Sequence, residues 1–304
     1  MTRPILVGLA LRDDDSAPLA LARALARIAG APLALTSVHP LDALTPIATV
    51  DYAKALQHAA RERLDAVAAP LRPDHDVTTY VTQGSRAGAI QELAERLDAV
   101  AIVVGSSHHG AIGRVVAGDV AAGLLHGAPC PVAVAPRGDT ERGLERIGVA
   151  YDASQESRAA AAVGFGLARR LGASVQVLSV VAPAAHTGAY VVPGWVAPTA
   201  IDTAAQDRYA GGAAERIVAE LGEGLDVTAE VLRGSVVATL AEVSASLDLL
   251  VCGSRGYGAL HSTLAGGVSR GLAHAAACPL LVVPRRTAPD VAALWAGREA
   301  IGAS

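Results

Sequence analysis

The chain has 304 residues, which is enough for two domains of ordinary size with substantial cores. Hydrophobic residues make up 52% of it and aromatic residues only 3%, a balance that favours helices packed closely on sheets through small side chains. With a net charge of −4 and no basic stripe, the composition argues against nucleic acid as a partner. No apolar run approaches the ~20 residues that span a bilayer, so no membrane segment is expected.

The N-terminal residues combine a short apolar run with the acidic cluster Asp13–Asp15, which is unlike a secretory signal peptide. The cysteines are odd in number, and all lie in or beside apolar strand-like runs: Cys130, Cys252 and Cys278. A reduced, cytoplasmic setting is therefore expected.

Apolar runs alternate with alanine- and leucine-rich stretches of helical length along the first half of the chain. The pattern predicts strands at residues 4–9, 33–39, 76–82, 99–105 and 131–135. It predicts helices at residues 17–29, 51–68, 88–97 and 119–125. Such alternation is typical of βαβ units around a parallel sheet.

The second half shows the same alternation after a short polar linker at residues 141–143. Its predicted strands are residues 145–151, 174–181, 226–232, 248–253 and 279–283. An extra stretch, Pro183 to Ala200, contains three prolines and is predicted to be an irregular surface loop, either a lid or an interdomain contact. In the C-terminal tail, Val291, Leu294 and Trp295 have helical spacing and could cover one domain or join two chains.

The two halves are copies of one domain. The run from Ile5 to Gly8 recurs at residues 147–150, and Gly105-Ser106 recurs as Gly253-Ser254. HGAPCP at residues 126–131 recurs as HAAACP at residues 274–279. The last strand of each copy is apolar and is expected at a sheet edge, and uncovered edges of this kind tend to pair.

A buried strand in the second copy runs into a glycine-rich loop and then a helix start. Gly253, Gly256 and Gly258 would let the backbone approach a ligand, and Gly266 to Ser269 would offer backbone N–H groups to an anion. A tight turn that binds nothing is the alternative. The spacing of Gly253, two residues, Gly256, nine residues and Gly266 resembles the ATP-binding signature of the universal stress protein family. The family has Ser or Thr where Gly267 stands, so one side-chain donor to phosphate is missing and weaker binding is expected.

The resemblance covers residues 3–286 and implies a Rossmann-like α/β fold: two open parallel five-stranded sheets of order 3-2-1-4-5, with helices on both faces. It divides the chain into a first domain at residues 1–140, a second at residues 144–287 and a tail at residues 288–304. In this family the last strands mediate dimerisation, so the two copies are expected to pair within one chain, and a homodimer stays open.

Strand order 3-2-1-4-5 places the loops after the first and fourth strands face to face, where ligands bind in open α/β sheets. Asp152 matches an aspartate that the family commonly has there. It could accept a hydrogen bond from a ribose hydroxyl, or help hold Mg²⁺ bound to ATP, or only cap the helix starting near Ser157. Val180 matches the position whose backbone meets adenine. The residues expected to bind ATP are Ala150, Tyr151, Asp152, Val180, Cys252, Gly253, Arg255, Gly256, Gly266, Gly267, Val268 and Ser269.

The first copy matches this pattern less well. Ala10 stands in place of Asp152, His108 in place of Gly256, and Asp119 in place of Gly267. A carboxylate beside phosphates is repulsive, and Asp119 also suits an N-cap. We therefore expect the second domain to be the better nucleotide site, and the first to be weak or adapted to another ligand.

Two other chemistries were weighed. His126 with Cys130, and His274 with Cys278, provide only two metal-ligand types per copy, so histidines at helix C-termini are the better interpretation. Ser254 and Ser269 lack the motif of a serine nucleophile and are interpreted as phosphate donors.

The sequence thus predicts a stress-linked regulatory protein that binds ATP at least in its second domain and whose occupancy alters contacts with a protein partner. No positioned general base is evident, so a binding protein is favoured over an enzyme. The alternatives are a nucleotide-free interaction scaffold and a slow ATP hydrolase of the adenine-nucleotide alpha hydrolase type, with the residue 183–200 loop roofing a second substrate pocket.

Overall fold

The computed structural model describes residues 3–11, 15–39, 50–107, 113–138, 143–182, 203–254 and 267–297. In the first domain the strands are β1 (Ile5–Gly8), β2 (Leu33–His39), β3 (Val77–Gln83), β4 (Ala101–Gly105) and β5 (Val132–Ala135). Its helices are α1 (Ser16–Ala29), α2 (Val50–Ala68), the 3-10 turn η1 (Ala69–Leu71), α3 (Arg86–Arg96) and α4 (Asp119–Gly127).

The second domain repeats this order. Its strands are β6 (Arg146–Ala150), β7 (Ser174–Val181), β8 (Val227–Arg233), β9 (Leu249–Ser254) and β10 (Leu280–Pro284). Its helices are α5 (Gln155–Leu171), α6 (Thr203–Leu221), α7 (Val236–Val243), the 3-10 turn η2 (Ser244–Ser246) and α8 (Gly267–Leu272), followed by α9 (Pro289–Ala296). All ten predicted strands are confirmed to within two residues.

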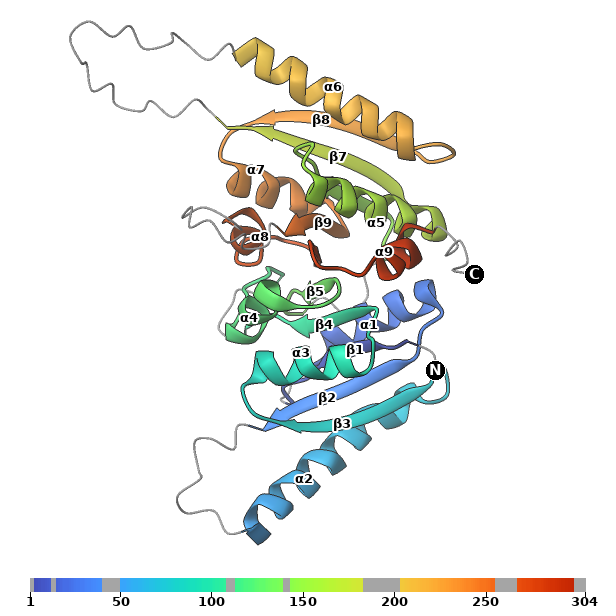
Figure 1. Ribbon diagram of the computed structural model, residues 1–304, viewed down its shortest axis with the longest axis vertical. Helices are drawn as coiled ribbons and strands as arrows, with labels where there is room; N and C mark the ends of the chain where they lie inside the picture. The colour runs from blue at the N-terminus through green and yellow to red at the C-terminus, as the bar shows by residue number, and fades with distance from the viewer. Residues whose placement is uncertain are drawn as a thin grey trace, which may run out of the picture.

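The strands form one continuous sheet in the order β3-β2-β1-β4-β5-β10-β9-β6-β7-β8. Each half is parallel and has the expected order 3-2-1-4-5. The halves meet where β5 and β10 pair antiparallel, with Ala133 opposite Leu281. The predicted pairing of the two last strands within one chain is therefore confirmed, and it merges the two expected sheets into one mixed sheet (Figure 1).

The helices cover both faces of the sheet, as the right-handed crossovers of parallel strands require. Helix α1 packs on β1 and β4, and α5 packs on β6 and β9. Contacts of α1 with α5, and of α4 with α8, continue the helix layers across the junction of the two domains. The strands next to that junction are apolar because both of their faces are buried.

Helix α9 covers part of the second domain, which is one of the two alternatives expected for the tail, and it also contacts the first domain. It packs against α5 of the second domain. The indole Nε1 of Trp295 donates a hydrogen bond to the carbonyl oxygen of Val100 in the first domain at 2.8 Å. Arg3 also pairs with Asp290 at the start of α9, at 2.5 Å. The tail therefore fastens the C-terminus of one domain to the other.

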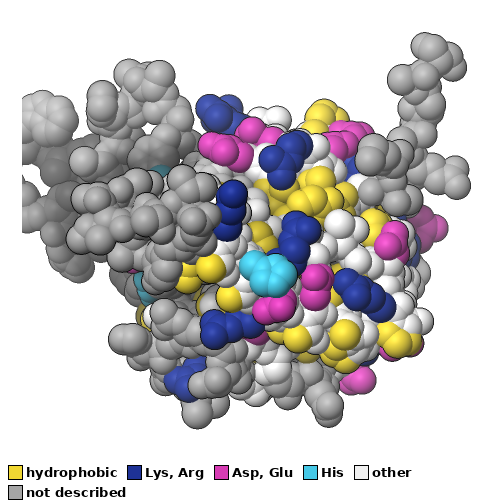
Figure 2. Space-filling view, turned by 90° about the horizontal axis from the view of Figure 1, so that it is seen from below, with side chains coloured by type: hydrophobic (Ala, Val, Ile, Leu, Met, Phe, Trp, Pro, Cys, Tyr) yellow, Lys and Arg dark blue, Asp and Glu magenta, His cyan; other side chains and the backbone are white. Residues whose placement is uncertain are grey.

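None of the helices in the described ranges has the length and apolarity that crossing a membrane requires. Figure 2 views the molecule from the α2 end, and on the described part of that face positive and negative side chains are interspersed. This face thus shows no single-sign patch of the kind that binds a polyanion such as nucleic acid. The linker residues 139–142 and the stretch at residues 183–202, with its predicted loop, lie outside the described residues.

Candidate functional site

Each half of the sheet has a pocket at the carboxyl ends of its first and fourth strands. These strands are neighbours in both halves: β1 with β4, and β6 with β9. Strand order reverses at these points, which is where open α/β sheets bind ligands. Because β5 and β10 run antiparallel, the two pockets lie at opposite edges of the ten-stranded sheet.

The pocket of the second domain has a volume of about 400 Å³, a size typical of small-molecule sites. Nine of the twelve residues predicted to bind ATP line it: Ala150, Tyr151, Asp152, Val180, Cys252, Gly253, Gly267, Val268 and Ser269. Arg255, Gly256 and Gly266 fall outside the described residues. The fold therefore brings the ends of β6, β7 and β9 and the start of α8 around one cavity.

Six further lining residues were not predicted: Ser154, Glu156, Ser157, Leu178, Val236 and Leu240. Most of them belong to the first turns of α5 and α7. The signal that could have identified them is geometric, because a helix that follows a parallel strand begins at the carboxyl edge of the sheet. Sequence reasoning considered the loops and passed over these first turns.

Asp152 orders the loop between β6 and α5. Its Oδ1 accepts hydrogen bonds from the backbone N–H and the hydroxyl of Ser154, the former at 3.0 Å. Ser154 is the N-cap of α5, and its hydroxyl accepts from the N–H of Ser157 at 3.2 Å. Asp152 is thus not the cap of this helix: it supports the capping serine and lines the pocket at the same time.

Gly253 and Gly267 of the predicted motif differ in how much space surrounds them. A Cβ at Gly253 would lie 2.5 Å from the carbonyl oxygen of Glu156, so the end of β9 packs directly against the first turn of α5. A Cβ at Gly267 would meet none of the described residues within 4 Å. Packing therefore accounts for Gly253, whereas Gly267 leaves open space beside the backbone N–H groups at the start of α8.

Buried side chains form the walls of this pocket. Burial raises the pKa of Tyr151, and burial raises the pKa of Cys252 to about 12, so both stay uncharged at neutral pH. The carboxylate of Glu156 lies 3.7 Å from the guanidinium of Arg285, an ion pair that partly balances the acidic side of the pocket. An adjoining cavity of about 540 Å³, between β7 and the start of α6, shares Tyr151, Asp152 and Val180 with it.

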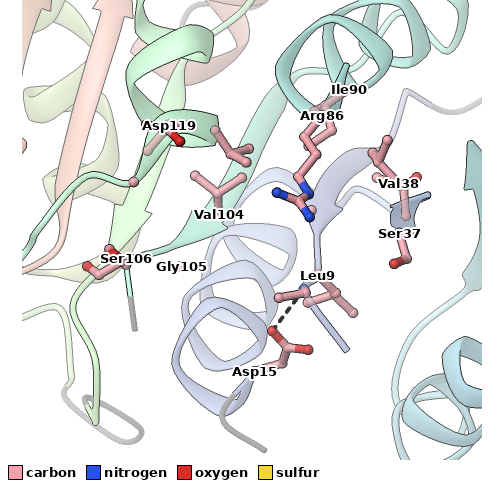
Figure 3. Close-up of a pocket in the computed structure, with 17 residues that line it drawn as sticks. Leu9, Asp15, Ser37, Val38, Arg86, Ile90, Val104, Gly105, Ser106 and Asp119 are labelled. Atoms are coloured by element: carbon pink, nitrogen blue, oxygen red, sulfur yellow. Dashed lines mark hydrogen bonds between the residues drawn. The ribbon is translucent and has the colours of Figure 1, made fainter. Parts of the chain in front are cut away.

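The pocket of the first domain has a volume of about 330 Å³, and the described residues that line it are drawn in Figure 3. Its walls come from the ends of β1, β2 and β4 and the starts of α3 and α4. Asp119 is the first residue of α4, and Gly118 is its N-cap, so the N-cap role considered for Asp119 is wrong. Its carboxylate instead sits in the first helical turn, at the pocket wall.

This pocket also contains a carboxylate that sequence reasoning missed. Ala10, which replaces Asp152, lines the pocket, and its backbone N–H donates to Asp15 Oδ1 at 3.2 Å. The N–H of Leu11 donates to Asp15 Oδ2 at 2.7 Å. The first pocket thus has a carboxylate five residues further along the chain than the position that corresponds to Asp152, and the run Asp13–Asp15 was the signal.

The loop between β4 and α4 is held by the second domain. The N–H of Val115 donates to the carbonyl oxygen of Ala276 at 2.7 Å, and the N–H of Ala117 donates to that of Ala273 at 2.6 Å. Both carbonyls belong to the turns that follow α8. The loop that leads into Gly118, a residue of the first pocket, is therefore bonded to the segment after the helix whose first residues line the second pocket.

The histidine and cysteine pairs show no metal geometry. His126 lies in the last turn of α4, and its Nδ1 is 3.1 Å from the carbonyl oxygen of Ala122. Within the described ranges, no group of three or more His, Cys, Asp or Glu side chains could hold a metal ion. Cys130 and Cys278 are buried, and neither forms a disulfide.

Comparison with known proteins gives one family. The model of the universal stress protein family matches residues 1–136 and 143–284. The chain is 33% identical over 190 residues to a universal stress protein of Mycobacterium tuberculosis (strain ATCC 25618 / H37Rv), a match that covers 61% of this chain and 62% of that protein. A universal stress protein of Mycolicibacterium smegmatis is 29% identical over 236 residues, 76% of this chain and 77% of its own.

Among solved structures, the chain is similar to the crystal structure of a universal stress protein from Archaeoglobus fulgidus DSM 4304. The TM-score is 0.70 at 21% sequence identity, and the match covers 94% of this chain and 99% of the other. At that identity the likeness concerns the fold, and it extends across both repeats.

Proposed function

The chain belongs to the universal stress protein family as two tandem domains, and from this membership we propose that its second domain binds ATP as a regulatory ligand in the stress response. The observation that carries the proposal is the pocket at the ends of β6 and β9. Nine residues chosen from the family signature and its neighbours line that one cavity, although they come from four separate parts of the chain.

The lining residues fit the parts of such a ligand. The backbone N–H groups of Gly267 and Val268 and the hydroxyl of Ser269 would donate to phosphate oxygens, and the open space at Gly267 leaves room for them. Asp152 would accept from a ribose hydroxyl or help hold phosphate-bound Mg²⁺. Val180, at the end of β7, would present its backbone to the base.

The proposal is tested at Gly267. An aspartate there has space to fit and would place a carboxylate against the triphosphate, at the position that Asp119 occupies in the first copy. We expect Gly267→Asp to weaken ATP binding by about tenfold or more, since a charge repulsion near 1.4 kcal/mol has that effect. Gly267→Asn is the matched control of the same size without charge, and calorimetric titration gives both affinities.

The wild-type measurement decides between this proposal and the scaffold alternative. Denaturing the purified protein and identifying released small molecules by chromatography shows whether a nucleotide is carried along. If no nucleotide is released and added ATP gives no heat stabilisation, the interaction scaffold replaces the ATP-binding protein.

A slow ATP hydrolase is the second candidate, and the adjoining cavity of about 540 Å³ favours it. A second substrate in that cavity would lie beside Tyr151 and Asp152, which both cavities share. Phosphate release from ATP that Gly267→Asp abolishes would support the enzyme. Binding of ATP without phosphate release would support the regulatory protein.

A further inference from the structure

The pocket of the first domain differs from its counterpart in where its charges lie. In the repeat, Arg86 corresponds to Val236, Asp119 to Gly267, and Ala121 to Ser269. All six residues line their respective pockets. The place that would receive phosphates in the second domain thus carries a carboxylate here, and a cation has been added on another wall.

Arg86 is a cation that pairs with no carboxylate in the part of the chain that the structure describes. It extends from the start of α3 into the pocket (Figure 3), and within the described part of the chain it forms no hydrogen bond or ion pair. It is the first residue of an 11-residue helix, where the macrodipole disfavours positive charge. The side chain of Ser85, the N-cap, makes no capping hydrogen bond either. Guanidinium and helix end together therefore favour an anionic group at this wall.

The opposite side of the pocket disfavours further negative charge. Asp119 lies across Val104 from Arg86 in Figure 3, and Asp15 lies at the base of the loop after β1. Because Asp119 stands where the second pocket has Gly267, its carboxylate lies at the position proposed for phosphates and repels them, whereas both carboxylates can accept hydrogen bonds from hydroxyl groups. The remaining wall is apolar and includes Leu9, Val38 and Ile90.

We propose that the first domain has a ligand site of its own, which takes a compact organic molecule with one anionic group, a carboxylate or a phosphate ester, and with hydroxyl groups on its body. The anionic group pairs with Arg86, the hydroxyls face Asp119 and Asp15, and the apolar part lies on Leu9 and Ile90. Triphosphates are excluded. The site does not depend on ATP binding in the second domain.

Amide NMR tests the two pockets separately in the full-length protein. The signals of Gly105 and Gly118 report on the first pocket, and those of Gly253 and Gly267 report on the second. The probes are adenosine 5′-monophosphate, the 5′-carboxylic acid of adenosine, and ATP. We expect at least one of the two single-anion probes to shift the first-pocket signals, and ATP to leave them in place. Which of the two binds more tightly distinguishes phosphate ester from carboxylate.

Charge variants assign the effect to residues. Arg86→Gln should weaken binding of the active probe in the first pocket by roughly tenfold to a hundredfold, the range for a hydrogen bond to a charged group. The matched control is Arg96→Gln, in the last turn of the same helix, which should leave the affinity unchanged. Asp119→Gly, which installs the residue found at position 267, should let ATP shift the first-pocket signals.

Three outcomes would overturn the proposal. The first is that neither single-anion probe shifts the first-pocket signals. The second is that ATP binds there as tightly as those probes, and the third is that Arg86→Gln leaves the affinity intact. Failure of ATP to shift Gly253 and Gly267 would instead contradict the proposed function of the second domain and leave this inference standing.

Discussion

At the scale of single residues, burial decides the chemistry of the thiols. Cys252 lies at the wall of the second pocket and Cys130 just before β5, and burial raises the pKa of both to about 12. Cys278 is buried as well, and its thiol donates to the carbonyl oxygen of Pro279 at 3.4 Å. Nucleophilic reactions of cysteine need the thiolate, so these side chains serve as small apolar packing groups.

We expect the native protein to leave all three thiols unreactive towards a disulfide reagent at neutral pH, because each is buried and no thiolate is accessible. Unfolding in urea should expose all three. Absorbance of the released thiolate measures the reaction. Fast reaction of one equivalent in the native state would contradict the burial of that cysteine.

Cys130 and Cys252 make stability depend on pH. Burial raises the pKa of both thiols in the folded protein to about 12, above the ordinary value of 9.0, so the folded state keeps protons that the unfolded chain loses. This contribution to the free energy of unfolding is complete below pH 9 and is lost as pH rises towards 12. We expect about 1.4 kcal/mol per thiol for each pH unit above 9, measured as a smaller slope of urea stability against pH in Cys130→Ala/Cys252→Ala.

At the scale of elements, the start of α5 links helix formation to the second pocket. Ser154 caps the helix, Asp152 holds Ser154, and both line the cavity. Ala153, between these two residues, has a positive φ of 62° and forms the tight turn from β6 into α5. One short loop therefore ends β6, begins α5 and shapes the site.

Ser154→Ala removes a capping hydrogen bond and should lower the free energy of unfolding by about 1 kcal/mol. Ser235→Ala is the matched control, since Ser235 occupies the N-cap of α7 without a side-chain capping bond. Urea unfolding followed by circular dichroism compares them. Equal losses of unfolding free energy in the two variants would show that the capping hydrogen bond of Ser154 does not stabilise α5.

The seating of α9 on α5 depends on Gly166. A Cβ at this position would lie 2.1 Å from the carbonyl oxygen of Trp295, a backbone atom. We expect Gly166→Ala to displace α9 and lower the melting temperature. Gly212→Ala in α6 is the control: its Cβ would meet only the end of Arg216 at 3.4 Å, so the better helix propensity of alanine should make it neutral or stabilising. A melting temperature of Gly166→Ala equal to that of the wild type would contradict this packing.

At the scale of the whole molecule, the junction of the two domains connects the elements that carry their pockets. Strands β5 and β10 join the sheets, and α9 spans both halves. The bonds from Val115 and Ala117 to the turns after α8 then connect the loop of the first pocket to the helix that begins at the second. The antiparallel junction produces this arrangement, because it sets the helix ends of one domain beside the loops of the other.

If ATP orders α8, as the proposed function requires, it should also strengthen these two bonds. We expect hydrogen exchange of the Val115 and Ala117 amides to slow when ATP is added, because their acceptors lie at the far end of α8. Amide exchange by NMR measures it, with Gly267→Asp as the control in which the same ATP concentration has a smaller effect. Unchanged exchange in the wild type under saturating ATP would show that the pockets are independent.

The amino-acid sequence by itself determined the repeated βαβ order, the ten strands and the family resemblance. Apolar periodicity and glycine spacing are local patterns, and duplication is found by comparing the chain with itself. It also predicted nine residues that line one pocket, because strand order 3-2-1-4-5 determines which loops lie next to each other. Their role in binding ATP stays a prediction.

Only the tertiary structure decided the rest. The compensating carboxylate of Asp15, the approach of Gly253 to Glu156, the orientation of Arg86 and the seat of α9 on Gly166 all depend on distances between residues far apart in the chain or on the path of a loop. Periodicity fixes which face a side chain takes within its own element, whereas packing between elements fixes what that side chain meets.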